Sequence, residues 1–317
     1  MTAALILGTP HSAAEQDSKE RADMFDPTKN VGGMSAIKRQ IETFRQAGIE
    51  QIAIVLGNDE DKIESHCARH CVAFVRYNKT DVRDDGLRAG LEYLKGRCSE
   101  VFVAPSNYPL FTAETVQKML ECETAVAYPE MEESQGYPVL LSGRIFDDIL
   151  SGGSIGDPLE LLCVQGADSS AVPVRDEGVL LNAETAEASE IDAAARLHPL
   201  RRLKPEVKVS LSREHSFFGP GTLHLLYLTG EAESLMQASK LMGLSYSKAR
   251  KIMARMETYL GYRVIESQHG GRAGGYSMLT PQARVLMEKY KALQEEIQEN
   301  AQEIFDKYFD DDMEMPE

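Results

Sequence analysis

The 317-residue chain contains no tryptophan, and its five cysteines are odd in number and widely spaced between residues 67 and 163. A disulfide framework needs paired cysteines at regular spacings, so these thiols are expected to be reduced. No run of about 18 apolar residues, the length that spans a bilayer, occurs. The start turns polar early and lacks the basic lead of a secretory signal, which predicts a cytoplasmic protein without a membrane partner.

Positive charge is scarce overall, because the formal net charge is -16, but it is unevenly distributed. Residues 1–200 carry 18 Lys and Arg against 33 Asp and Glu, residues 201–291 carry 15 against 7, and residues 292–317 carry 1 against 10. The local field decides where a phosphate backbone can bind, so the overall acidity does not exclude a nucleic-acid partner.

The chain is longer than a single core usually grows, which favours two domains. In the first part, short apolar runs alternate with helical patterns, and this alternation predicts a three-layer, Rossmann-like α/β domain with a largely parallel sheet. Pro199 and Pro205 interrupt the chain after it. The predicted division is a first domain at 1–195, a linker at 196–206, a second domain at 207–309 and an acidic tail at 310–317. The strand-like runs are "AALILG", "QIAIVLG", "VAFVRY", "EVFVAPS" and "AVAYPE".

The sequence of the second domain predicts a strand in "VKVSLSREHSFF", a helix in "GTLHLLYLTG" and a second helix in "SLMQASKLM". Ser234 and Ser245 stand where caps of the second and third helices are needed. The third helix carries an apolar stripe, which leaves a polar and basic face on its other side. "RVIESQHGGRAGGYSMLTP" then predicts two short strands around a glycine-rich tip.

This order of elements is that of a winged helix-turn-helix domain, in which the third helix enters the major groove of double-stranded DNA. Any helix has a polar face, so the order of elements is the stronger signal. Short polar side chains near the helix start can reach base edges, Lys and Arg neutralise phosphates, and the glycine-rich tip approaches a groove. The candidate DNA-binding residues are Ser245, Tyr246, Ser247, Lys248, Lys251, Arg255, Gly271, Arg272 and Gly274.

A last long helix is expected from Thr280 and Pro281 onward. Apolar residues follow heptad-like steps along it, and a polar Asn300 stands between the last two, as at positions that fix register in a coiled-coil dimer. This pattern favours a homodimer through the C-terminal helix, with packing of the helix on its own domain as the alternative. The seam residues are Leu286, Tyr290, Leu293, Ile297 and Ile304.

"FFGPGTLHLLYL", "QASKLMGLSYSKARKIMARME" and "ESQHGGRAGGYSMLTPQAR" resemble the amino-terminal DNA-binding domain of molybdate-dependent regulators, which is related to the LysR-type winged helix. The resemblance runs from about Phe217 to Lys291. It implies DNA binding and a dimerising helix after the Leu-Thr-Pro sequence. The molybdate-binding domains that normally follow in this family are not in the sequence, so direct molybdate sensing by that route is not expected.

"ALILGTPHS", "GGMSAIKRQIETFRQAGIEQIAIVLG", "VFVAPSNYPLFTAETV" and "QGYPVLLSG" resemble, in this order, the nucleotidyltransferase domain of molybdenum-cofactor cytidylyl- or guanylyltransferases. The resemblance implies a glycine-rich loop that binds nucleotide phosphates, with cations after it and carboxylates that hold Mg²⁺. The candidate nucleotide-binding positions are Gly8, Lys19, Arg21, Asn107, Asn182 and Glu184.

Several of these positions depart from the family pattern. Pro10 removes an amide donor from the loop, and Lys19 and Arg21 stand only as substitutes for the family's cations. Asn107 occupies the place of the metal-binding Asp, while Asn182 and Glu184 occupy the two later acidic places. An amide keeps the shape of a carboxylate but lacks the charge that Mg²⁺ requires. We therefore expect a catalytically degenerate domain without a catalytic residue or a resident metal.

"SHCARHC" places His66, Cys67, His70 and Cys71 at spacings that can bind zinc on a helix. Structural zinc needs four ligands, and no second cluster completes such a site. The favoured interpretation is a helix end with partly buried thiols, and metal binding stays open.

Together these features predict a DNA-binding transcription regulator of molybdenum-cofactor or molybdoenzyme metabolism. Its degenerate transferase domain either senses a nucleotide or pterin-type effector or serves as a scaffold. The alternatives are an active Mg²⁺-dependent cytidylyl- or guanylyltransferase that also binds DNA, and a winged helix that binds protein.

Overall fold

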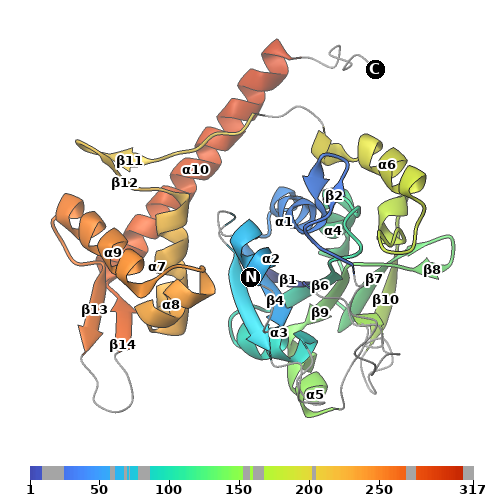
Figure 1. Ribbon diagram of the computed structural model, residues 1–317, viewed down its shortest axis with the longest axis horizontal. Coiled ribbons are helices and arrows are strands. Elements are labelled where there is room, and N and C mark those ends of the chain that lie inside the picture. Colours follow the sequence, from blue (N-terminus) through green and yellow to red (C-terminus); the bar gives the residue numbers. More distant parts are fainter. Residues whose placement is uncertain are drawn as a thin grey trace. The chain divides into compact units, whose positions relative to one another are not determined.

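The computed structural model describes residues 1–8, 25–57, 61–67, 70, 72–77, 86–152, 158–159, 168–201, 205–268 and 276–309. The chain divides into two compact units, Met1–Arg201 and Arg202–Glu317 (Figure 1). Helix α6 (Ala188–Leu197) and a 3-10 helix (Pro199–Arg201) belong to the first unit, so ordered structure continues past residue 195.

The first unit is built on one mixed sheet with strand order β10-β7-β9-β6-β1-β4-β5, and β8 (Ser134–Gln135) pairs with β7. Only β9 runs antiparallel to its neighbours along this order. The five strand-like runs of the sequence form β1, β4, β5, β6 and β7. The strands are β1 (Thr2–Leu7), β4 (Gln51–Gly57), β5 (Ala73–Tyr77), β6 (Glu100–Pro105), β7 (Val126–Met131), β9 (Val139–Ser142) and β10 (Ser169–Pro173).

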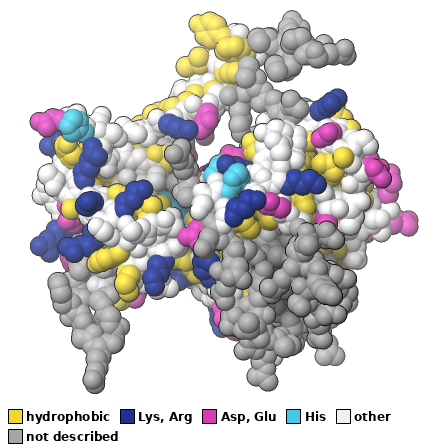
Figure 2. Space-filling model, viewed as in Figure 1, with side chains coloured by type: hydrophobic (Ala, Val, Ile, Leu, Met, Phe, Trp, Pro, Cys, Tyr) yellow, Lys and Arg dark blue, Asp and Glu magenta, His cyan; other side chains and the backbone are white. Residues whose placement is uncertain are grey.

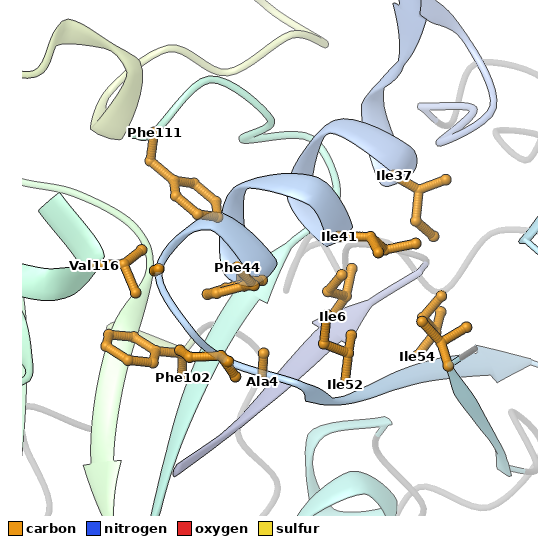
Figure 3. Packing of buried hydrophobic residues seen from close by; sticks show 14 of the residues in the cluster. Ala4, Ile6, Ile37, Ile41, Phe44, Ile52, Ile54, Phe102, Phe111 and Val116 are labelled. Carbon is orange, nitrogen blue, oxygen red and sulfur yellow. The ribbon is translucent and has the colours of Figure 1, made fainter. Parts of the chain in front are cut away.

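Helices cover both faces of this sheet because its central strands are apolar on both sides. Ala4 and Ile6 of β1 face one main core cluster, to which α1 contributes Ile37, Ile41 and Phe44 (Figure 3). Leu5 points to the opposite face, where a side chain at Gly90 of α3 would meet it at 2.5 Å. The helices of this unit, besides α6, are α1 (Ala36–Gln46), α2 (Asp61–Cys67), α3 (Gly86–Leu94), α4 (Ala113–Met119) and α5 (Phe146–Ser151). A short hairpin, β2 (Asn30–Val31) and β3 (Met34–Ser35), precedes α1.

The second unit contains the helices and the strand pair predicted for it. Its elements are β11 (Leu211–Ser212), β12 (Ser216–Phe218), α7 (Pro220–Ala232), α8 (Leu235–Leu241), α9 (Tyr246–Leu260), β13 (Ile265–Gln268), β14 (Tyr276–Leu279) and α10 (Pro281–Tyr308). The strand expected from Val207 is shorter than its apolar alternation indicates, because only Leu211 and Ser212 pair with β12.

Side-chain caps fix where these helices begin. Ser234, Ser245 and Thr280 each accept a hydrogen bond from the backbone N–H three residues later, at 3.3, 3.3 and 3.2 Å. These bonds satisfy donors that a helix start leaves unpaired. Gly243 and Gly261 adopt positive φ angles of 61° and 78° at the two ends of the α9 segment, which a residue with a side chain rarely does.

Helix α10 departs from the predicted dimer seam at Tyr290. This side chain is buried in its own unit, where its ring lies 4.9 Å from that of Phe218 and its hydroxyl donates to the Val209 carbonyl oxygen at 2.8 Å. The Asn300 amide donates to Glu296 O of its own helix at 2.6 Å. Leu293 and Ile304 remain exposed. Tyr290 is therefore a core residue rather than a seam residue.

Among the described helices, none combines the length and the apolar character needed to cross a membrane.

Candidate functional site

The carboxyl ends of β1 and β6 mark the point where the chain changes direction across the first sheet. From β1 the chain adds β4 and then β5 on one side, and it later returns to place β6 on the other side of β1. In open α/β sheets, ligands bind outside the carboxyl ends of the strands at such a switch point. Gly8 follows β1 here, and Asn107 lies two residues after β6.

Gly8 brings the backbones of β1, β4 and β6 close together. Its N–H donates to Val55 O at 3.0 Å, and its carbonyl oxygen accepts from the Ser106 hydroxyl at 3.1 Å. A Cβ atom on Gly8 would lie 2.7 Å from Val55 O, which is too close for any side chain. A glycine is therefore required at position 8 for these strands to pack.

Asn107 and Glu184 meet although 77 positions separate them. The Asn107 amide nitrogen donates to a Glu184 carboxylate oxygen at 3.3 Å, and Ala183 N donates to Asn107 O at 2.7 Å. Asn107 is 6% exposed, and its side-chain oxygen Oδ1 is buried with no hydrogen-bond partner in the part of the chain that the structure describes. Glu184 is exposed. The structure thus brings together two of the sequence-predicted positions.

Asn182, by contrast, is used in its own turn. Its side-chain oxygen accepts from Glu184 N at 2.9 Å, and its carbonyl oxygen accepts from the backbone N–H groups of Thr185 and Ala186. Its amide therefore holds the turn that carries Glu184. Lys19 and Arg21 lie outside the described residues.

Buried polar side chains that the sequence analysis missed hold the segment after β6 in place. The Gln40 amide donates to Pro105 O at 2.7 Å and to Tyr108 O at 2.9 Å. His198 Nε2 lies 3.1 Å from Phe111 O. Asp176 accepts from the backbone N–H of Thr112 at 2.8 Å. In the sequence these residues carry no signal, because each partner lies far away along the chain.

These oxygens do not fit a divalent cation of the kind that the transferase resemblance implies. Mg²⁺ takes oxygen ligands in near-ideal octahedral geometry and is usually bound through carboxylates. Here an amide N–H points at the Glu184 carboxylate, and the Asn182 oxygen is engaged in a turn. Within the described ranges, no group of three or more His, Cys, Asp and Glu residues could hold a metal ion.

The His and Cys side chains near the end of α2 lie in different environments. His66 Nε2 lies 2.8 Å from the Ser35 hydroxyl, whereas Cys67 is buried in the main core of the first unit, where burial raises the pKa of its thiol to about 12. His70 Nδ1 lies 3.4 Å from a Glu42 oxygen. Cys71 lies outside the described residues. This arrangement matches the expected helix end with a buried thiol.

The predicted DNA-binding residues on α9 lie on one exposed face. Ala249, Met253 and Met256 are buried against the rest of the second unit. The exposed residues are Ser245, Tyr246, Ser247, Lys248, Lys251 and Arg255. Figure 2 shows Lys and Arg side chains on the visible face of this unit around α9. Gly271, Arg272 and Gly274 lie outside the described residues.

Comparison with known proteins agrees with the arrangement of the first unit. Residues 27–157 match the MobA-like NTP transferase domain. A structure of a Mycobacterium tuberculosis Rv0371c homolog from Mycobacterium sp. strain JC1 is similar to this chain in fold, with a TM-score of 0.50 and 15% identity, over 62% of this chain and 98% of that one.

Two curated proteins share shorter stretches with the chain. The bifunctional protein GlmU of Cellvibrio japonicus (strain Ueda107) is 25% identical over 108 residues, which are 34% of this chain and 24% of that protein. The molybdenum-pterin-binding protein MopB of Rhodobacter capsulatus is 33% identical over 86 residues, 27% of this chain and 32% of that protein. The chain therefore spans about a quarter of the length of the first and about a third of the second.

His198 makes the stability of the first unit depend on pH. Burial lowers the pKa of His198 below its ordinary value of 6.5, and Leu200 N donates to Nδ1, so the neutral ring with a proton on Nε2 fits both contacts. The contribution of the neutral His198 ring to the free energy of unfolding is then fully present above pH 6.5. It is lost as the pH falls below 6.5, with a slope of at most about 1.4 kcal/mol per pH unit for one group. We expect His198→Gln to reduce the change in the urea-unfolding midpoint between pH 7 and pH 5.

The exposed His215 provides the matched control, because His215→Gln should keep the wild-type pH dependence. Burial also lowers the pKa of His66, so the slope is reduced in His198→Gln rather than abolished. An unchanged slope in His198→Gln would contradict this assignment.

Proposed function

We propose that this chain is a DNA-binding transcription regulator of molybdenum-cofactor or molybdoenzyme metabolism, and that its MobA-like domain no longer transfers nucleotides and senses a small-molecule effector. The observation that carries the proposal is the exposed face of α9, which combines short polar residues at the helix start with Lys and Arg farther along it. Similarity to a MobA-like domain and to a molybdenum-pterin-binding protein supports the metabolic connection.

Helix α9 has the features that insertion into the major groove requires. Ser245 caps its start, and Leu244 N donates to Ser239 O at 2.8 Å, which holds α8 and α9 together across a tight turn. The first turn of α9 is thereby presented with exposed Tyr246 and Ser247, which can reach base edges. Lys251 and Arg255 follow one and two turns later, at the spacing for contacts to the phosphate backbone.

Lys251→Ala and Arg255→Ala should each weaken DNA binding and flatten its salt dependence, because each lost phosphate contact reduces the slope of log affinity against log salt by about 0.9. Fluorescence anisotropy of the full-length protein, on duplex DNA from its own upstream region and on a scrambled duplex, measures both effects. Lys29→Ala, which removes an exposed positive charge from the first unit, is the matched control.

If Lys251→Ala and Arg255→Ala both kept the wild-type salt dependence of DNA binding, this orientation of α9 on DNA would be refuted. Absence of any salt-sensitive DNA binding by the wild-type protein would refute the regulator and favour the second unit as a protein-binding module.

We further propose that the regulator is a homodimer formed through α10. Beyond Tyr290 this helix exposes Leu293, Ile304 and Tyr308, and Phe305 stacks on Phe309 with ring centroids 4.8 Å apart. Exposed apolar residues on a long helix are typical of a surface that a second copy covers. A dimer would present two copies of α9 to two half-sites.

Leu293→Glu combined with Ile304→Glu should convert the dimer to a monomer and weaken DNA affinity, because charges would be buried in the shared surface. Sedimentation equilibrium measures the mass. Lys289→Glu introduces the same negative charge at an exposed polar position of α10 and should leave the dimer intact. A wild-type protein that is monomeric at micromolar concentration would contradict the dimer.

The second candidate function is Mg²⁺-dependent cytidylyl or guanylyl transfer with an appended DNA-binding unit. The match to the MobA-like NTP transferase domain and the retained Glu184 favour it. We expect no pyrophosphate release above background from CTP or GTP with Mg²⁺ and molybdopterin, and none after Asn107→Asp, because Pro10 also removes an amide donor from the phosphate loop. Release at ordinary enzyme rates by the wild-type protein would establish the transferase instead.

A further inference from the structure

The Asn107 side chain is oriented so that its nitrogen, and not its oxygen, faces the Glu184 carboxylate. Nδ2 lies 3.3 Å from Glu184 Oε2, and Oδ1 on the other side of the amide is buried without a partner among the described residues. One ion cannot be ligated by Oδ1 and by Glu184 together in this orientation, because the amide N–H group stands between the two oxygens. In the absence of a cation, turning the amide over would replace this attractive contact with two facing oxygens.

The charge that the described residues give this site is also too low for a hard cation. Among them Glu184 supplies one carboxylate, and the third oxygen at hand, Asn182 Oδ1, already accepts the Glu184 backbone N–H at 2.9 Å. A divalent ion bound here would meet one negative charge from these residues and would break the Asn107–Glu184 hydrogen bond. A hydrogen-bond donor on a ligand pairs with the Glu184 carboxylate without breaking that bond.

We infer that the Asn107–Glu184 pair holds no divalent cation and that a ligand contacts the exposed Glu184 carboxylate through its own N–H or O–H groups. This inference rests on the proposed loss of nucleotidyl transfer. It deepens that proposal, because it makes ligand recognition at the switch point of the sheet independent of Mg²⁺ and selects groups that donate hydrogen bonds.

Binding of Mn²⁺ tests this inference directly, because electron paramagnetic resonance measures the concentration of free Mn²⁺. The full chain is acidic and will bind some Mn²⁺ at its surface, so the informative quantity is the change caused by Glu184→Gln. Glu187→Gln is the matched control, because it removes another exposed carboxylate three residues away, at the position that precedes α6. Asn107→Asp, which places two carboxylates side by side, shows what a cation site at this position looks like.

We expect Glu184→Gln and Glu187→Gln to change wild-type Mn²⁺ binding equally, whereas Asn107→Asp gains a site that Glu184→Gln removes and that binds Mn²⁺ about tenfold more tightly than the wild-type surface. A wild-type Mn²⁺ site that is lost in Glu184→Gln and kept in Glu187→Gln would overturn the inference. The measurement reads cation binding alone, and pyrophosphate release reads transfer, so the two proposals fail separately.

Discussion

The polar anchoring of the segment that follows β6 is the constraint on which the candidate site depends. An apolar sheet sets the positions of β1 and β6 but not the path of the chain beyond their ends. Gln40 from α1, Asp176 and His198 supply buried hydrogen bonds to this segment from three distant parts of the chain. Buried polar groups are costly when unpaired, so each of these contacts restricts the backbone to one path.

That path brings a remote turn onto Asn107. Because Ala183 N donates to Asn107 O, the turn from Asn182 to Ala186 lies against the carboxyl end of β6. Gly178 permits a similarly close approach, since a Cβ atom there would lie 1.9 Å from Leu110 O. The first unit therefore has a framework that holds two oxygen-bearing side chains in contact, although one of them is an amide where the resemblance to molybdenum-cofactor transferases implies a carboxylate.

Much of the fold follows from local patterns, and the exceptions have a common physical origin. Apolar runs identified the central strands, and Ser234, Ser245 and Thr280 marked the helix starts, because strand burial and capping depend on neighbouring residues. Strand β9 and the role of Tyr290 were not foreseen. Tyr290 fits a heptad equally well whether it faces a partner or its own Phe218, so spacing alone cannot distinguish the two. For the site, sequence selected Asn107 and Glu184 through a resemblance, but neither their contact nor Gln40 had a local signal.

The two units carry complementary chemistry that a regulator would use. The acidic first unit does not attract DNA, whereas the basic stretch at residues 201–291 carries Lys248, Lys251 and Arg255 on one helix. Coupling between them would require that the ligand bind two states of the proposed regulator with different affinity. If the site at Asn107 and Glu184 recognises the ligand through direct hydrogen bonds, the binding energy depends on how closely the turn at Glu184 lies to Asn107.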